Sequence, residues 1–250
     1  MITKTIISIG LLRLLSIALA GLFVTAVAFY FSPEEFGTYS LVFSVIQISC
    51  AAVLSWPNQA FLRFGRETFR STGSLGGPLG ARLVIHAVLL TIMIALLLIF
   101  FEQFATHIDV SRKDFFWFFL ISILVLPASD IGLLAAQACG KFRAYGMAPV
   151  LQRALQLGTV LFVIIGLSPT WQLLLGFSIL GYLASAFLTW RDIPGEVLQP
   201  KISIPEISRM LRYAWALPLA TLGAFLLQWM DLWFIRAYMD IATVGHYSWA

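Results

Sequence analysis

Seven long apolar segments constrain the fold of this chain more than any other feature. They cover residues 8–31, 38–64, 80–101, 115–138, 148–167, 170–190 and 213–238, and residues 248–250 are expected to open an eighth. Each segment reaches the roughly 20 residues that a helix needs to cross the hydrocarbon layer of a membrane. The segments are too long for membrane-spanning strands and lack their apolar–polar alternation. The sequence therefore predicts an all-α bundle.

The composition indicates that a membrane surrounds these helices. Hydrophobic residues make up 60% of the chain and charged residues only 11%, whereas a soluble domain carries about 25% charged residues. The basic residues cluster in the loops between apolar segments, so the net charge of +4 does not indicate a nucleic-acid partner. We predict an all-α integral membrane protein in contact with membrane lipids.

A single polar stretch divides the chain. Residues 191–212 contain Pro194, Pro200 and Pro205 and lie between the sixth and seventh apolar segments. We interpret residues 1–190 as an N-terminal six-helix transmembrane lobe and 191–212 as a cytoplasmic linker. Residues 213–250 would then be the start of a second transmembrane lobe.

A short motif after the first apolar segment recurs after the seventh. Gly37, Tyr39 and Ser40 correspond to Gly245, Tyr247 and Ser248, 208 residues later (245 minus 37). Self-similarity at a fixed spacing is the usual sign of duplicated architecture. Six spans separate the two copies, so they have the same orientation and predict a parallel repeat about an axis along the membrane normal.

The distribution of basic residues predicts which end of the bundle is cytoplasmic, because lysine and arginine stay preferentially inside. With the N-terminus inside, only three of the 16 basic residues lie outside, namely Arg112, Lys113 and Arg236. The other thirteen lie on the inner side: Lys4, Arg13, Arg63, Arg66, Arg70, Arg82, Lys141, Arg143, Arg153, Arg191, Lys201, Arg209 and Arg212. The sequence predicts a cytoplasmic N-terminus, with both Gly-x-Tyr-Ser turns outside.

Two carboxylates within the apolar segments are candidate ion-coupling residues. An ionisable group near the bilayer centre costs roughly 2.5–3.5 kcal/mol on insertion scales, so its presence calls for a reason. Asp130 lies in the fourth segment, one turn after Pro127, and a structural hydrogen bond is the alternative to an ion site. Asp231 lies in the seventh segment, where pairing with Arg236 is the alternative.

Three arginines and two neighbouring amides are candidate binding residues. Arg63 follows Asn58 and Gln59 in a polar break that a cavity lining explains better than lipid contact does. Arg13 lies some seven residues into the first segment, where a long side chain can also snorkel to the membrane surface. Arg153 is an alternative candidate that also fits an ordinary interfacial arginine.

Signatures of enzymes and metal sites are absent from the sequence. It contains no H-E-x-x-H motif and no G-x-S-x-G nucleophile elbow, and its three histidines are scattered. Cys50 and Cys139 are too few for a disulfide framework or a metal site. We therefore expect a transporter without a cofactor or metal, and no enzyme.

The order and spacing of several motifs resemble a known family. They are the segment from Ser32 to Ser40, Asn58–Arg63, Gln137–Arg143, Tyr213–Pro218, Asp231, and the second Gly-x-Tyr-Ser. Together they resemble the Wzx-type flippases of polysaccharide biosynthesis, in the multidrug/oligosaccharidyl-lipid/polysaccharide exporter superfamily. The resemblance covers essentially the whole chain, and no single motif is diagnostic.

The resemblance implies a fold, a substrate and a location. It implies two bundles of six or more helices around a central cavity, of which this chain would be a truncated part. Such flippases move undecaprenyl-diphosphate-linked oligosaccharide across the bacterial cytoplasmic membrane by alternating access, with H⁺ or Na⁺ as the coupling ion. Arg13 and Arg63, followed by Arg153, would then bind the diphosphate, because a guanidinium group suits paired phosphate oxygens.

Two other functions stay open. An exporter of the multidrug-and-toxin-extrusion type has the same two-lobe fold, and would favour an acidic, aromatic cavity over arginines. A membrane-embedded glycan polymerase or ligase would need a sizeable outer loop with catalytic charges. The longest outer loop that we expect, residues 102–114, is short for that purpose.

Overall fold

The computed structural model describes residues 2–249, and the side chains of residues 7–51 and 53–249. This part of the chain is helical apart from short connections. The helices are α1 (Ile2–Tyr30), α2 (Pro33–Ile48), the π-helix η1 (Ser49–Ser55), α3 (Asn58–Thr72), α4 (Gly76–Ile108), α5 (Arg112–Ala138), α6 (Phe142–Ile164), α7 (Trp171–Arg191), α8 (Gly195–Leu198), α9 (Ile204–Ala214), α10 (Leu217–Tyr238) and α11 (Ile241–Trp249).

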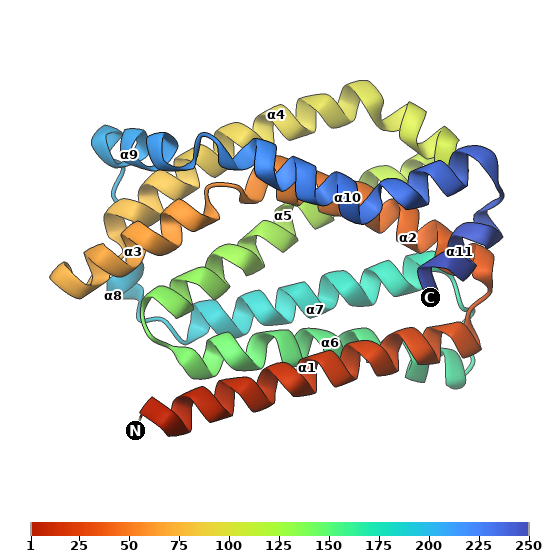
Figure 1. The fold of residues 1–250 in the computed structure, drawn as a ribbon, viewed down its shortest axis with the longest axis horizontal. Coiled ribbons are helices and arrows are strands. Elements are labelled where there is room, and N and C mark those ends of the chain that lie inside the picture. Colours follow the sequence, from red (N-terminus) through yellow and green to blue (C-terminus); the bar gives the residue numbers. More distant parts are fainter. Residues whose placement is uncertain (1, 250) are drawn as a thin grey trace.

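Seven of these helices are long and apolar enough to cross a membrane. They comprise α1, α2 continued by η1, α4, α5, α6, α7 and α10, so the predicted number of spans is confirmed by length and composition. The long helices run side by side along the longest axis of the molecule (Figure 1). The chain is therefore an all-α, multi-pass bundle of the membrane type.

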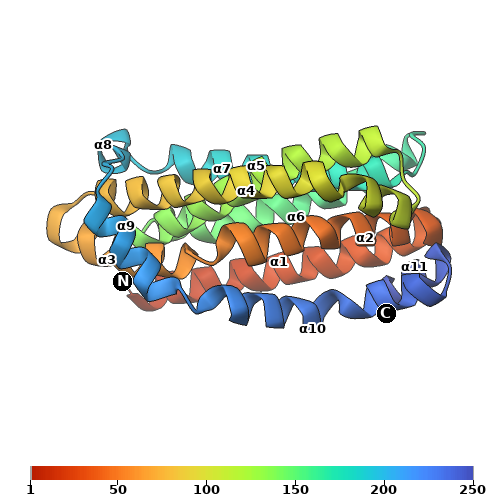
Figure 2. The same ribbon diagram turned by 90° about the horizontal axis from the view of Figure 1, so that it is seen from above.

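The helices α3, α8 and α9 gather at one end of the bundle. In Figure 1 the start of α1, the helices α3, α8 and α9, and the turn between α5 and α6 lie at this end, which we call the basic end. The turn between α1 and α2, together with α11, lies at the opposite end. Figure 2 shows α10 on the outside of the bundle, away from α5 and α7.

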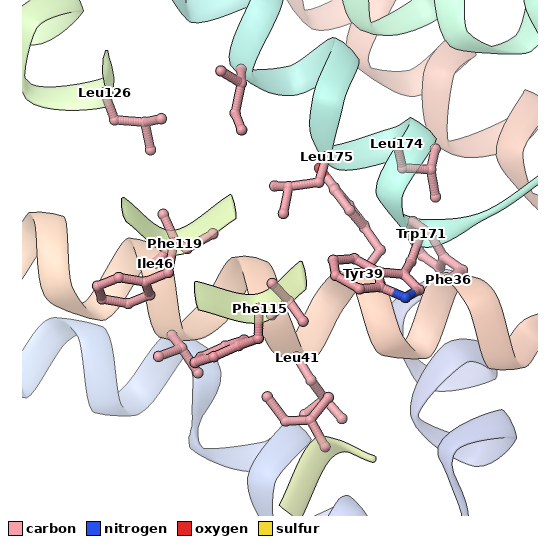
Figure 3. Packing of buried hydrophobic residues seen from close by; sticks show 14 of the residues in the cluster. Phe36, Tyr39, Leu41, Ile46, Phe115, Phe119, Leu126, Trp171, Leu174 and Leu175 are labelled. Atoms are coloured by element: carbon pink, nitrogen blue, oxygen red, sulfur yellow. The ribbon is translucent and has the colours of Figure 1, made fainter. Parts of the chain in front are cut away.

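The main apolar core lies between α2, α5 and α7. Leu41 and Ile46 of α2, Phe115 and Ile123 of α5, and Leu174 of α7 are fully buried. Figure 3 shows these three helices contributing aromatic and aliphatic side chains to one cluster. α1 packs mainly against α6 and leaves much of its surface exposed.

The second span is shorter than the sequence predicted. We expected it to cover residues 38–64, but the membrane helix begins at Pro33 and ends at Ser55. Pro57 lacks the N–H that would continue the helix, and Trp56 and Pro57 form a turn. Residues 58–64 belong instead to α3, an amphipathic helix that buries Ala60, Phe61 and Phe64.

The two copies of the Gly-x-Tyr-Ser motif begin helices at equivalent positions. α1 ends at Tyr30 and α10 at Tyr238, while α2 begins at Pro33 and α11 at Ile241. Both pairs are 208 residues apart, as are Gly37 and Gly245. The helix that we expected to open at residue 248 therefore begins at Ile241.

The polar stretch 191–212 is folded onto the bundle at the basic end. α9 packs on α3 and α4, and buries Met210 and Ala214 completely. The backbone N–H of Lys201 donates to the carbonyl oxygen of Gly76 at 2.8 Å, and that of Leu75 donates to Val197 at 2.9 Å. We call residues 191–212 the strap, because they are hydrogen-bonded across the start of α4.

Candidate functional site

A completely buried arginine stands at the break between η1 and α3. Arg82, near the start of α4, has no solvent exposure. Its Nη2 donates to the carbonyl oxygen of Leu54 at 2.7 Å and to Asn58 Oδ1 at 2.9 Å, and its Nε donates to Asn58 Oδ1 at 3.1 Å. Arg82 thus donates to a backbone carbonyl in the last turn of a membrane helix, where the carbonyl groups have no hydrogen-bond donor within the helix.

Asp130 lies beside this break on the neighbouring helix α5. Its Oδ2 accepts a hydrogen bond of 3.4 Å from Ser55 Oγ, at the last residue of η1. Arg82 donates to the carbonyl oxygen of the preceding residue, Leu54, so Arg82 and Asp130 contact the same break from α4 and α5. It forms no salt bridge within 4.0 Å in the described part of the chain. Arg82, Asn58, Ser55 and Asp130 thus form one polar group, which we call the break cluster.

A second polar network links α6 and α7 to α2. Arg153 Nη1 donates to Gln156 Oε1 at 2.7 Å, and Gln156 Nε2 donates to Ser178 Oγ at 3.2 Å. Ser178 is in turn hydrogen-bonded to the hydroxyl of Tyr39 at 3.1 Å. Gln156, Ser178 and Tyr39 are buried. Arg153 therefore takes part in the bundle interior.

The depth of Arg153 differs from the expectation based on the sequence. We placed it one turn into a span beginning at residue 148, whereas α6 begins at Phe142. Eleven residues of helix put Arg153 about 16 Å from that end. Pro149 did not stop the helix, although a proline inside a helix removes a backbone hydrogen bond.

A row of arginines covers one side of α3 at the basic end. Gln59, Arg63, Arg66 and Arg70 are separated by four, three and four residues, a spacing that places them on one helix face. They line an open pocket of about 720 Å³ with Glu67 and Tyr213. We call these four residues the arginine face.

Aromatic rings support the arginine face from behind. The guanidinium group of Arg63 lies 4.8 Å from the ring centre of Tyr213 and 5.8 Å from that of Phe64. Glu67 forms a 2.9 Å salt bridge with Arg209 of α9. No salt bridge to Arg63, Arg66 or Arg70 is found among the described residues, so their charges are available to an anion.

The structure distributes the predicted site residues over several places. Gln59 and Arg63 share the arginine face, while Asn58 points away from them to Arg82. Arg13 is exposed on α1, where it contacts the Tyr145 hydroxyl and lies over that ring at 5.4 Å.

Asp231 is exposed near the opposite end of the bundle. It accepts a hydrogen bond of 2.9 Å from the hydroxyl of Tyr247 in α11. Arg236, its expected alternative partner, donates instead to the carbonyl oxygen of His107 at 3.1 Å. Asp130 and Asp231 therefore lie in separate surroundings.

Sequence reasoning missed Arg82 and most of the α6–α7 network. Arg82 was counted among the basic residues of the inner side, although it falls within the third apolar segment. An arginine two residues into such a segment was the available signal. The roles of Ser178 and Tyr39 could not be predicted in this way, because hydroxyl groups are common in membrane helices.

No metal or cofactor site is evident in this arrangement. Among the described residues, no three His, Cys, Asp or Glu side chains come together as a metal site would require. No protein-family model, curated protein or solved structure matches the chain. The chemistry of the side chains therefore carries the functional assignment.

Proposed function

We propose that this chain is part of a flippase that moves an undecaprenyl-diphosphate-linked oligosaccharide across the bacterial cytoplasmic membrane by alternating access. The arginine face is the observation that carries this proposal. Three guanidinium groups without carboxylate partners line an open pocket next to the membrane helices. Guanidinium groups bind phosphate oxygens in pairs through parallel N–H donors, so the pocket has the chemistry to receive a diphosphate headgroup.

The distribution of basic residues supports a cytoplasmic position for the arginine face. Arg82 and Arg153 lie inside the bundle, so they leave the earlier count of thirteen inner residues and reduce it to eleven, against three outside. This bias still favours a cytoplasmic basic end. A lipid-linked glycan assembled in the cytoplasm would meet the arginine face first.

The repeated helix boundaries support a two-lobe transporter. α10 and α11 repeat the boundaries of α1 and α2 at a constant spacing. α10 contacts α2, and α1 contacts α11. Such reciprocal contacts are what a two-fold axis along the membrane normal would produce between two lobes. In this proposal α11 opens the second helix of the second lobe.

The interior polar groups would carry the coupling and the passage of the sugar. Asp130 in the break cluster is our candidate for H⁺ or Na⁺, with Asp231 as the second. Arg153 and the amides around it offer hydrogen bonds to hydroxyl groups. Arg13 is exposed on α1 and would contact the diphosphate during transfer.

A small-molecule exporter is the second candidate function. Asp130 accepts a hydrogen bond from Ser55, and the Tyr182 hydroxyl accepts one from Gln47 of α2 at 3.4 Å. A carboxylate and an aromatic ring within one bundle would suit an organic cation. This reading makes no use of the arginine face, so neutralising that face would leave drug export intact.

A membrane-embedded glycan polymerase or ligase is the third candidate function. The connections at the opposite end are short, with residues 109–111 between α4 and α5 and residues 165–170 between α6 and α7. They leave little room for a catalytic loop, and we therefore favour transport over this reading.

Complementation of a strain that lacks its flippase tests the proposal. Arg63→Ala should abolish export of the glycan and leave lipid-linked glycan at the inner leaflet. Arg63→Lys should restore export only in part, because lysine keeps the charge but loses the bidentate geometry. Arg143→Ala is the matched control, since Arg143 is an exposed arginine of α6 at the same end outside the pocket.

Protein level in the membrane separates binding from folding. Arg63 is exposed, so its alanine variant should insert at the normal level. Full export by the Arg63→Ala, Arg66→Ala and Arg70→Ala triple variant would contradict the assignment of the diphosphate to this face. Arg13 and Arg153 would then be the remaining candidates.

A further inference from the structure

An apolar pocket of about 430 Å³ lies between α4 and α10, in the half of the bundle nearer the opposite end. Its floor is formed by buried side chains that include Met93, Leu97 and Phe119. Its rim is formed by exposed ones that include Phe100 and Leu226. The pocket is thus an apolar cleft that opens at the surface of the described helices.

Two of the polar lining side chains, Ser49 and Trp233, already have hydrogen-bond partners. Ser49 Oγ donates to the carbonyl oxygen of Val45 at 2.8 Å, and Trp233 Nε1 donates to Ser44 Oγ at 3.1 Å. An apolar cavity of this kind does not hold water and binds apolar ligands instead. At this depth in a membrane, the available apolar ligand is a hydrocarbon chain.

The length of the pocket matches one leaflet of a bilayer. Along α4 its lining runs from Met93 to Phe104, and eleven residues of helix span about 16 Å. Half of a hydrocarbon core of about 30 Å is nearly the same length. One acyl chain of a phospholipid fits this length, whereas a long polyisoprenoid chain exceeds it.

A positive charge lies near the end of the pocket that is lined by Phe104 and Trp233. The Arg236 side chain bridges α10 and α4 by donating from Nε to the carbonyl oxygen of His107 at 3.1 Å. The His107 ring stacks on Trp233, with the ring centres 5.6 Å apart. No carboxylate side chain in the described part of the chain lies within 4.0 Å of Arg236. Its free N–H groups are therefore available to a lipid phosphate.

We propose that the α4–α10 pocket holds one acyl chain of a phospholipid from the leaflet at the opposite end, with the lipid phosphate at Arg236. This site is separate from the arginine face and does not depend on the flippase assignment. A lipid bound in the pocket would contact α4 and α10 together, so its binding would affect the position of α10.

Photolabelling with a phospholipid that carries a diazirine at the end of one acyl chain tests the site. The protein is reconstituted in vesicles that contain this lipid, and the labelled peptides are identified by mass spectrometry. We expect label at the pocket floor, on Met93 or Phe225. Leu97→Phe, which fills the pocket, should remove that label. Leu98→Phe on the exposed side of the same helix should leave it unchanged.

A second variant tests the headgroup without disturbing the floor. Arg236→Gln should reduce labelling by the phospholipid. Labelling by a diacylglycerol with the same diazirine chain should stay unchanged. Arg236→Lys should restore labelling by the phospholipid. The proposal is overturned if the label is spread equally over the exposed faces of α4 and α10. It is also overturned if an excess of a polyisoprenoid phosphate removes the label while unlabelled phospholipid does not.

Discussion

Gly37 in α2 and Gly245 in α11 pack against each other so closely that neither position has room for a side chain. A Cβ atom on Gly37 would lie 3.0 Å from the backbone nitrogen of Gly245, and one on Gly245 would lie 2.6 Å from the carbonyl carbon of Pro33. These are the glycines that the repeated motif places 208 residues apart. The two copies of the motif therefore meet face to face.

Alanine at either glycine should separate α2 from α11. We expect Gly37→Ala and Gly245→Ala each to lower the free energy of unfolding by about 1–3 kcal/mol, the usual cost of overpacking. Gly21→Ala in α1 is the matched control, because a Cβ there meets nothing within 4 Å. Thermal unfolding of the purified variants measures the difference. Equal stability of all three would contradict the close packing.

Arg82 and Asp130 should depend on each other energetically. Arg82→Ala leaves the carbonyl oxygen of Leu54 and Asn58 Oδ1 without their donor, which should cost about 3 kcal/mol or more. The Asp130→Ala change should cost less in an Arg82→Ala background than in the wild type, with a coupling of about 0.5–3 kcal/mol. Denaturant unfolding of the four proteins gives this coupling. Strict additivity would show that the two charges do not interact.

Cysteine labelling checks the orientation of the bundle. Cysteine at Glu34 or Thr243 should react with an impermeant reagent from outside the cell, and cysteine at Arg70 or Lys201 should not. The native Cys50 is buried, and burial raises the pKa of the Cys139 thiol to about 11. Cys139 is at the basic end, so a reagent outside the cell should not reach it. In inside-out vesicles its labelling should be slow near neutral pH and rise as the pH approaches 11, because the thiolate is the reactive form. The reverse labelling pattern would place the arginine face outside.

Asp240 should hold the first turn of α11 in a pH-dependent way. Its Oδ1 accepts hydrogen bonds from the backbone N–H and the hydroxyl of Thr243, at 2.8 and 2.6 Å, and these hold the Asp240 pKa below its ordinary value of 3.8. A depressed pKa in the fold means that the stabilisation is present at neutral pH. It is lost as the pH falls through that depressed value.

Hydrogen exchange of α11 measures this cap. At neutral pH the Asp240→Ala variant should show lower protection than the wild type. Asp240→Ser should largely retain it, because Ser32 caps α2 at the equivalent position. Equal protection in the alanine variant would show that packing on α2 alone holds α11 in place.

The spans were predictable because membrane insertion depends on local hydrophobicity. α1 and α10 end within one residue of the expected positions, and Ser32 and Asp240 cap the helices that follow them. The end of the second span was not predictable in the same way. Phe61, Leu62 and Phe64 made residues 58–64 look like its continuation, whereas Pro57 had already ended it.

Parts of the candidate site depend on contacts between distant residues. Gln59 and Arg63 share a face because of their spacing within one helix, and that could be predicted. Asn58 is turned away from them by Arg82, which is 24 residues further along the chain. The network from Arg153 to Tyr39 needs α6, α7 and α2 to be packed together. Helical spacing cannot supply such pairings.

The strap formed by residues 191–212 has a practical consequence for handling the protein. Its prolines and charges make it look like the natural place for a protease site or a fused reporter. Insertion tolerance, however, follows from how the backbone is bonded and buried. A Cβ on Gly80 would overlap the backbone of Lys201, and Ile193 at the start of the strap is only 4% exposed. We expect a reporter inserted there to disrupt the protein. One inserted directly before Gly73, which has open space beside it and precedes the buried Leu75, should be tolerated.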